Sequence, residues 1–117
     1  LIYDIVFLRP LGIRLHDNET VMQWRSKADP ADITYARRYL GLSEAEGFNW
    51  GVIRGGMSSV ADTFVTQMQD YLGLGAEGRM NAPGSAVGNW QWRLLPGEAS
   101  MNLAKKIRQY TKMYGRL

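Results

Sequence analysis

Residues 79–93 read Arg-Met-Asn-Ala-Pro-Gly-Ser-Ala-Val-Gly-Asn-Trp-Gln-Trp-Arg and are the most informative stretch of the chain. Pro83-Gly84 predicts a turn. Trp90 and Trp92 are two positions apart, which in an extended segment places both rings on one face. Indole rings stack on flat ligands and also fill protein cores. The stretch predicts a shaped loop with aromatic and amide groups. We expect its flanking arginines to hold it through carboxylates, with Asp62 and Asp70 as the candidates.

The sequence on either side of this loop predicts three helices. The first begins at Asp29-Pro30, because aspartate caps a helix and proline suits its first position, and it ends at Gly41. Residues 63–68 fit either a strand or a continuation of the second helix. Apolar residues at helical spacing indicate the other two helices, with Trp50, Ile53, Met57 and Val60 in the second and Leu103, Ile107, Tyr110 and Tyr114 in the third.

The chain has 117 residues, which is enough for one small domain with one core, and it contains no cysteine. The lack of cysteine excludes a disulfide and a thiolate metal site, and it is compatible with a cytoplasmic protein. The sequence begins at Leu1 and not at methionine, so we expect a processed product or a fragment. Residues 1–8 are apolar but too short to span a membrane.

The net charge of +3 is concentrated at the C-terminal end. Residues 97–117 carry five Lys or Arg side chains against Glu98 alone, whereas the remainder of the chain is close to neutral. A basic helix could contact nucleic acid or an anionic membrane. A solvated outer face, whose cations favour the helix C-terminus, explains the same pattern. We therefore expect no nucleic-acid partner and no membrane partner.

Arg-Met-Asn-x-Pro-Gly followed by Gly-Asn-Trp-x-Trp-Arg, within residues 79–93, resembles the C-terminal signature of a known family. That family is the 4-alpha-glucanotransferases, which are the amylomaltases or disproportionating enzymes of glycoside hydrolase family 77, and further motifs resemble it in the same order. Residues 16–20, His-Asp-Asn-Glu-Thr, are similar to its His-Asp-Asn-Asp-Thr segment. Residues 37–41 are similar to the Arg-Arg-Tyr-Leu-Gly that follows, and residues 69–75 to the region of its final barrel strand.

This resemblance implies an α/β fold in which residues 1–117 are a single segment, the C-terminal portion of a (β/α)8 TIM barrel. The segment would supply the last two strands, their helices and the closing helix, and His16-Asp17 would end the seventh strand. Two lone strands leave their edges open. We therefore expect the isolated chain to be helix-rich, or to form a homodimer by pairing unpaired strand edges with a second copy.

The resemblance also implies an enzyme that transfers α-1,4-glucan segments between maltooligosaccharides with retention of configuration. Such chemistry needs a nucleophilic carboxylate and a second carboxyl group as acid and base. The family carries both upstream, in Arg-x-Asp-His and Glu-Asp-Leu-Gly motifs that this chain lacks, so the isolated chain is expected to be inactive. The resemblance assigns Asp17 the catalytic role of stabilising the transition state. It assigns substrate binding to His16, Asn81, Ala82 and Pro83.

Without the family resemblance, several of these residues allow a second interpretation. Asp17 and Asn81 are each also explained as turn residues. We expect no metal site, because His16 is the only histidine and lacks suitably spaced carboxylates, and we expect no cofactor. Trp90 and Trp92 could form a platform for a sugar ring, although core packing against the barrel is the interpretation we favour. The alternative function is a non-catalytic carbohydrate-binding or interaction module.

Overall fold

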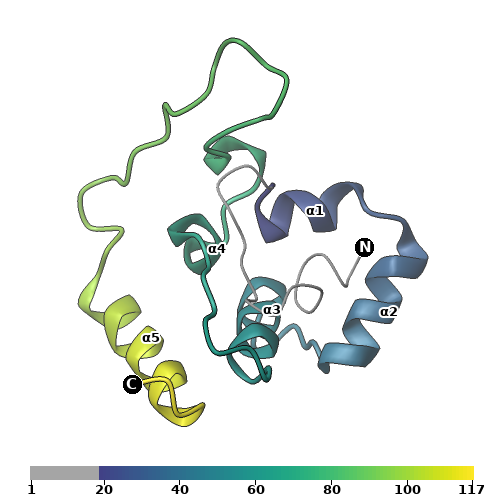
Figure 1. The fold of residues 1–117 in the computed structure, drawn as a ribbon, viewed down its shortest axis with the longest axis vertical. Helices are drawn as coiled ribbons and strands as arrows, with labels where there is room; N and C mark the ends of the chain where they lie inside the picture. Colours follow the sequence, from purple (N-terminus) through teal and green to yellow (C-terminus); the bar gives the residue numbers. More distant parts are fainter. Residues whose placement is uncertain (1–18) are drawn as a thin grey trace.

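The structure, a computed structural model, describes residues 19–117, and Figure 1 shows how its helices are arranged. Its elements are α1 (Val21–Lys27), α2 (Pro30–Leu40), α3 (Phe48–Met57), α4 (Met68–Leu72), a 3-10 turn (Ala76–Gly78) and α5 (Met101–Met113). Apart from an isolated β-bridge at Val65, no strand forms within these residues. The expectation of a helix-rich chain is confirmed for this part. None of the helices in residues 19–117 has the length and apolar character needed to cross a membrane.

Residues 63–67 form neither the strand nor the continued helix expected for this segment, and Val65 alone makes a β-bridge. Helix α3 already ends at Met57, and the chain then runs irregularly until α4 begins at Met68. A strand needs a neighbouring strand to exchange backbone hydrogen bonds, and residues 19–117 supply none. The homodimer through unpaired strand edges therefore has no strand on which to form in this part of the chain. The strand expected before His16 lies outside the described residues.

Local capping explains the bounds of α2. Asp29 caps the helix by accepting a hydrogen bond from the Ala31 amide at 2.8 Å, and Pro30 is the first helical residue. Gly41 ends the helix in the left-handed conformation, with a φ of 62°. The helix predicted between Asp29-Pro30 and Gly41 is confirmed.

Helix α3 is the centre of the helical core and contacts α1, α2, α4 and α5 (Figure 1). Its glycines let neighbouring side chains approach closely, because a Cβ on Gly51 would run into Leu42 and one on Gly55 into Leu40. Burial of apolar side chains on α1, α2 and α3 provides the main stabilisation of this core. The buried cluster consists of Val21, Trp24, Ala36, Leu40, Phe48 and Val52.

Helix α5 packs on α3 through its apolar stripe and through a polar cluster. Tyr110 and Trp50 have ring centroids 5.0 Å apart, and the Tyr110 hydroxyl donates to Glu46 Oε2 at 2.9 Å. Arg54 donates from Nε to both Glu46 carboxylate oxygens at 3.0 Å. The predicted amphipathic helix is confirmed by the half-buried stripe of Leu103, Ile107, Tyr110 and Tyr114.

This polar cluster shifts the pKa values of its members. Burial alone would raise the pKa of Glu46, but hydrogen bonds from Arg54 and Tyr110, with the charges of Arg54 and Lys106, outweigh burial and lower that pKa below its usual value. Burial and the hydrogen bond to Glu46 raise the pKa of Tyr110 to about 12. Both shifts favour an ionised Glu46 and a protonated Tyr110 at neutral pH.

Candidate functional site

Three of the five predicted site residues belong to the described part of the chain. Asn81, Ala82 and Pro83 begin the long loop that follows the 3-10 turn and runs away from the helical core (Figure 1). Asn81 and Ala82 are half-buried, and Pro83 is exposed. His16 and Asp17 lie outside the described residues, so the roles assigned to them stay predictions.

The loop of residues 79–93, called the 79–93 loop below, is closed by its own hydrogen bonds. The Trp90 amide donates to the Met80 carbonyl oxygen at 2.6 Å. The Ala82 amide donates to Asn89 Oδ1 at 2.9 Å. The start and the end of the loop are therefore joined beside the predicted substrate-binding residues.

Glycines make the turns within this loop. Gly84 and Gly88 have φ values of 84° and 79°, a region that glycine enters without steric cost. The turn predicted at Pro83-Gly84 is confirmed. Asn89 Nδ2 also donates to the Ser85 carbonyl oxygen at 2.9 Å, which ties the tip of the loop to its returning arm.

The two tryptophans are not arranged as in an extended segment. Trp90 has a φ of 62°, in the left-handed region, so the alternation expected of extended backbone fails at this residue. Trp90 is 51% exposed and Trp92 is half-buried. Trp90 is therefore not part of the helical core of residues 19–117, and packing of the two tryptophans against the rest of a barrel stays a prediction.

Main-chain oxygens, and not a carboxylate, hold Arg93. Its Nη1 donates to the carbonyl oxygens of Trp90 and Trp92, each at 2.8 Å. At the other end of the loop, Arg79 Nε donates to the Asn81 carbonyl oxygen at 2.9 Å. Both arginines thus brace the backbone of the loop, and the carboxylate partner expected for Arg93 is replaced by carbonyl groups.

A buried polar network joins α1, α3 and α4. Asp70 and Thr20 are both 0% exposed. Asp70 Oδ1 accepts a hydrogen bond from the Val21 amide at 2.8 Å, which places a carboxylate at the N-terminal end of α1, where the helix dipole favours negative charge. Asn49 Nδ2 donates to the Asp70 carbonyl oxygen at 2.7 Å. The network satisfies backbone groups that burial would otherwise leave unpaired.

The same network reaches the base of the 79–93 loop. Thr20 Oγ1 donates to the Gly75 carbonyl oxygen at 3.1 Å, and Gln69 Nε2 donates to the Gly78 carbonyl oxygen at 3.0 Å. Gly78 directly precedes the loop, and Thr20 directly precedes α1. Residues of α4 therefore position both the loop base and the start of α1.

Sequence reasoning did not single out Gln69 and Thr20 as positioning residues, and it considered Asp70 only as a carboxylate partner for the arginines of the loop. The available signal was the pair of adjacent polar residues Gln69-Asp70, which the chain shares with the family motif. Their function as anchors depends on partners far away in the sequence, such as Val21 for Asp70. A local pattern carries no information about such a partner.

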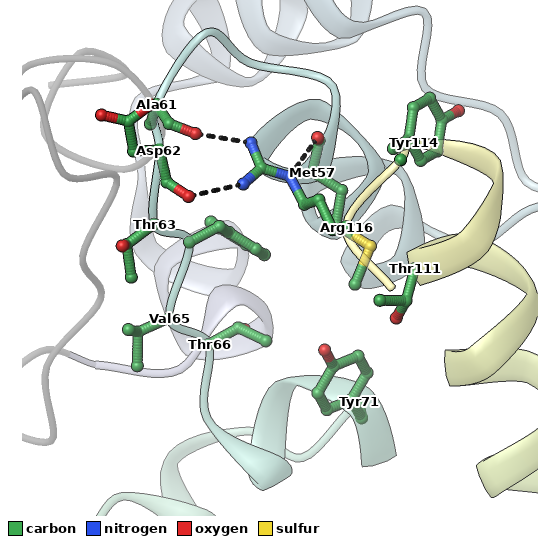
Figure 2. A pocket seen from close by; sticks show the side chains of 12 residues that line it. Met57, Ala61, Asp62, Thr63, Val65, Thr66, Tyr71, Thr111, Tyr114 and Arg116 are labelled. Carbon is green, nitrogen blue, oxygen red and sulfur yellow. Dashed lines mark hydrogen bonds between the residues drawn. The ribbon is translucent and has the colours of Figure 1, made fainter.

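A cleft of about 690 Å³ lies between α5 and the segment that precedes α4 (Figure 2). Arg116 forms part of its wall and donates to the carbonyl oxygens of Met57 at 2.6 Å and Ala61 at 2.8 Å. Its guanidinium group is thus occupied by backbone acceptors. Asp62 is the only carboxylate among the described residues that line the cleft, so these residues do not supply the pair of carboxyl groups that glycoside chemistry needs.

The described part of the chain contains no candidate metal site. Residues 19–117 contain no group of three or more His, Asp or Glu side chains that could hold a metal ion. The structure shows a loop that is closed by its own hydrogen bonds, rests on a buried polar network and leaves Trp90 about half exposed in this chain.

The described helices match part of a known enzyme structure. The solved amylomaltase from Streptococcus agalactiae in complex with acarbose is similar with a TM-score of 0.83 and 32% sequence identity, covering 87% of this chain and 21% of that chain. Amylomaltases are TIM-barrel proteins, so this chain corresponds to one part of a TIM-barrel fold.

Sequence comparison gives the particular family. The family model described as 4-alpha-glucanotransferase matches residues 12–99. The chain is 45% identical over 102 residues to the 4-alpha-glucanotransferase of Clostridium butyricum, covering 86% of this chain and 21% of that protein. It is 41% identical over 107 residues to that of Thermus thermophilus, covering 87% and 21%. The chain belongs to the 4-alpha-glucanotransferase family, and it spans about a fifth of the length of these relatives.

Proposed function

We propose that this chain is the part of a 4-alpha-glucanotransferase that contacts the glucan and stabilises the transition state. The whole enzyme would transfer α-1,4-glucan segments between maltooligosaccharides with retention of configuration. The observation that carries this proposal is the family match over residues 12–99, which includes both the His16-Asp17 pair and the 79–93 loop. The related structure from Streptococcus agalactiae is a complex with acarbose, which supports a sugar ligand for this chain.

Asp17 takes the central chemical role in this proposal. A retaining transfer passes through a transition state with oxocarbenium character. A carboxylate beside the sugar stabilises the positive charge as it develops. His16 hydrogen-bonds sugar hydroxyl groups, and Asn81, Ala82 and Pro83 border the groove that holds the glucan.

The nucleophile and the acid/base belong to other residues of the enzyme. Neither of the two upstream family motifs, Arg-x-Asp-His and Glu-Asp-Leu-Gly, occurs in this sequence. The chain is then a single segment from the C-terminal part of the barrel, inactive alone. Carboxyl groups perform all the acid, base and nucleophilic steps of this reaction, so the proposed enzyme needs no metal and no cofactor. It would act on maltodextrins in the cytoplasm.

A chimera tests this function. The matched fifth of the Streptococcus agalactiae amylomaltase is exchanged for this chain, and disproportionation of maltotriose is measured. We expect transfer by the chimera, and we expect Asp17→Asn to lower kcat by about a hundredfold or more, because stabilisation specific to the transition state is lost. Asp62→Asn is the matched control, since Asp62 is an exposed carboxylate, and it should keep its activity.

Two results would contradict this proposal. The first is a folded chimera that binds maltotriose without transferring glucan, and the second is an Asp17→Asn chimera as active as its parent. The 51% exposure of Trp90 favours a second candidate, a carbohydrate-binding module without chemistry. That candidate predicts glucan binding by the isolated chain together with an inactive chimera.

A further inference from the structure

The start of α1 is bonded to α4 and to the segment that follows α4 (Figure 1). Thr20 Oγ1 donates to the Gly75 carbonyl oxygen at 3.1 Å, and the Val21 amide donates to Asp70 Oδ1 at 2.8 Å. The two pairs are 55 and 49 residues apart in sequence. Two long-range hydrogen bonds at neighbouring positions restrict rotation as well as distance. This junction therefore fixes the orientation of the start of α1 relative to α4.

Water does not compete for the hydrogen bonds of this junction. Thr20 and Asp70 are 0% exposed, and Val21 is 1% exposed. The helices of residues 19–117 alone produce this burial, so further protein around the chain leaves the three residues buried. A buried amide that loses its partner costs more free energy than one hydrogen bond contributes on balance. The junction consequently has no alternative arrangement of similar stability.

The two regions assigned to the sugar lie close to this junction in sequence. Asp17 is three positions before Thr20, and three residues reach at most about 11 Å even when fully extended. Asn81 is three positions after Gly78, whose carbonyl oxygen accepts from Gln69 Nε2 at 3.0 Å. Helix α4 thus anchors the chain near both regions, through side chains at two adjacent positions.

We propose that Thr20 and Asp70 are positioning residues for the transfer reaction, which hold the segment carrying Asp17 in register with the glucan groove. The proposal rests on the function proposed above, and Asp17 enters it only through its place in the sequence. A group that acts in the transition state needs accurate placement, because a displacement of about 1 Å can lower the rate about a hundredfold. Both positioning side chains are fully buried, so they act through the backbone and do not contact the sugar.

The chimera described above tests this role by rescue. Thr20→Val keeps the side-chain shape but removes the donor to Gly75, whereas Thr20→Ser keeps the hydroxyl group. We expect Thr20→Val to lower kcat about tenfold and to change KM less than about twofold, because Gln69 still anchors the base of the loop. Thr20→Ser should keep most of the parent kcat. Ile107→Ala on α5 is the control, since it removes apolar contacts and lowers Tm but should keep the parent kcat below that Tm.

A matched pair of variants tests the Asp70 side of the junction. Asp70→Asn keeps an oxygen acceptor for the Val21 amide, whereas Asp70→Ala leaves this buried amide unpaired. We expect Asp70→Ala to lower kcat more than Asp70→Asn does. Gln69→Leu releases the base of the loop instead, and it should mainly raise KM. Equal kcat values in the two Asp70 variants would overturn the role of Asp70, and Thr20→Val decides the proposal if Asp70→Ala does not fold.

A distance measurement tests the junction without using activity. Spin labels are attached through Asn18→Cys, beside Asp17, and Ala86→Cys in the loop, in a chimera whose other cysteines are replaced. Pulsed electron paramagnetic resonance should give a broader distance distribution for Thr20→Val than for the parent and Thr20→Ser. The positioning role is overturned if Thr20→Val keeps the parent kcat, if Ile107→Ala shares the loss, or if an inactive chimera keeps the parent distribution. A broadened distribution in a chimera that transfers no glucan overturns the proposed function alone.

Discussion

The helical core and the 79–93 loop are stabilised in opposite ways. In the core, helices distant in sequence pack on α3, and Ile53 is only 1% exposed. In the loop, hydrogen bonds join residues near one another in sequence, and Val87 stays 80% exposed. Tertiary packing stabilises the core, whereas the hydrogen bonds described within the loop are local. In this chain, apolar side chains of the loop stay exposed while the helical core is packed.

Ile53→Ala should destabilise the helical core, and its effect on the free energy of unfolding should be the largest among the variants considered. Truncating a fully buried isoleucine removes apolar contacts and leaves a cavity, which costs about 2–5 kcal/mol in the free energy of unfolding. Val87→Ala removes a side chain of similar chemistry from the loop, and its effect should lie within about 0.5 kcal/mol. Urea denaturation followed by circular dichroism measures both. Equal losses in the two variants would show that the loop is part of the cooperative core.

The same division decides how much of the fold could be predicted from the sequence. The bounds of α2 were predictable because Asp29, Pro30 and Gly41 act on adjacent backbone groups. The structure of residues 63–68 was not, because a strand exists only with a partner, and the described part of the chain provides none. Helical spacing also extended the second helix to Val60, which is exposed and lies beyond the end of α3.

The candidate site likewise has features that could be predicted from the local sequence and features that could not. The turn at Pro83-Gly84 follows from local chemistry and was predicted. The left-handed Trp90 was not, because its φ depends on the bonds to Met80 and Arg93, which are not visible in a residue pattern. The position of Asp70 at the start of α1 depends on folding of the whole helical core and was missed for that reason.

The pH dependence of the free energy of unfolding tests the contribution of Glu46 to the helical core. Its pKa is lower in the folded chain than its usual value near 4.5. A carboxyl group with a depressed folded pKa contributes stability that is present above the unfolded pKa and is lost as pH falls through the folded pKa. The free energy of unfolding should therefore decrease below about pH 4.5, and urea titrations between neutral and acidic pH measure that decrease.

Glu46→Gln isolates this contribution. At neutral pH the variant should be less stable by about 1 kcal/mol, because the hydrogen bonds from Arg54 and Tyr110 lose their charged acceptor. The difference from the parent should shrink as pH falls, since the parent carboxylate becomes protonated. Glu44→Gln is the control, because the Glu44 side chain is 81% exposed, and it should change little. A constant difference across the pH range would rule out the charge of Glu46 as its cause.

Asn89→Ala tests whether local hydrogen bonds hold the loop closed, and it should have the smallest effect on the free energy of unfolding. The variant removes the acceptor of the Ala82 amide and the donor to the Ser85 carbonyl oxygen. Both groups lie at or near the surface and can bond water, so the free energy of unfolding should change by less than about 0.5 kcal/mol. Amide hydrogen exchange should nevertheless accelerate at Ala82 and Trp90, because bracing by Asn89 holds the loop closed. Acceleration that spreads into α3 would instead mean that the core depends on the loop, since local bonding predicts a change confined to the loop.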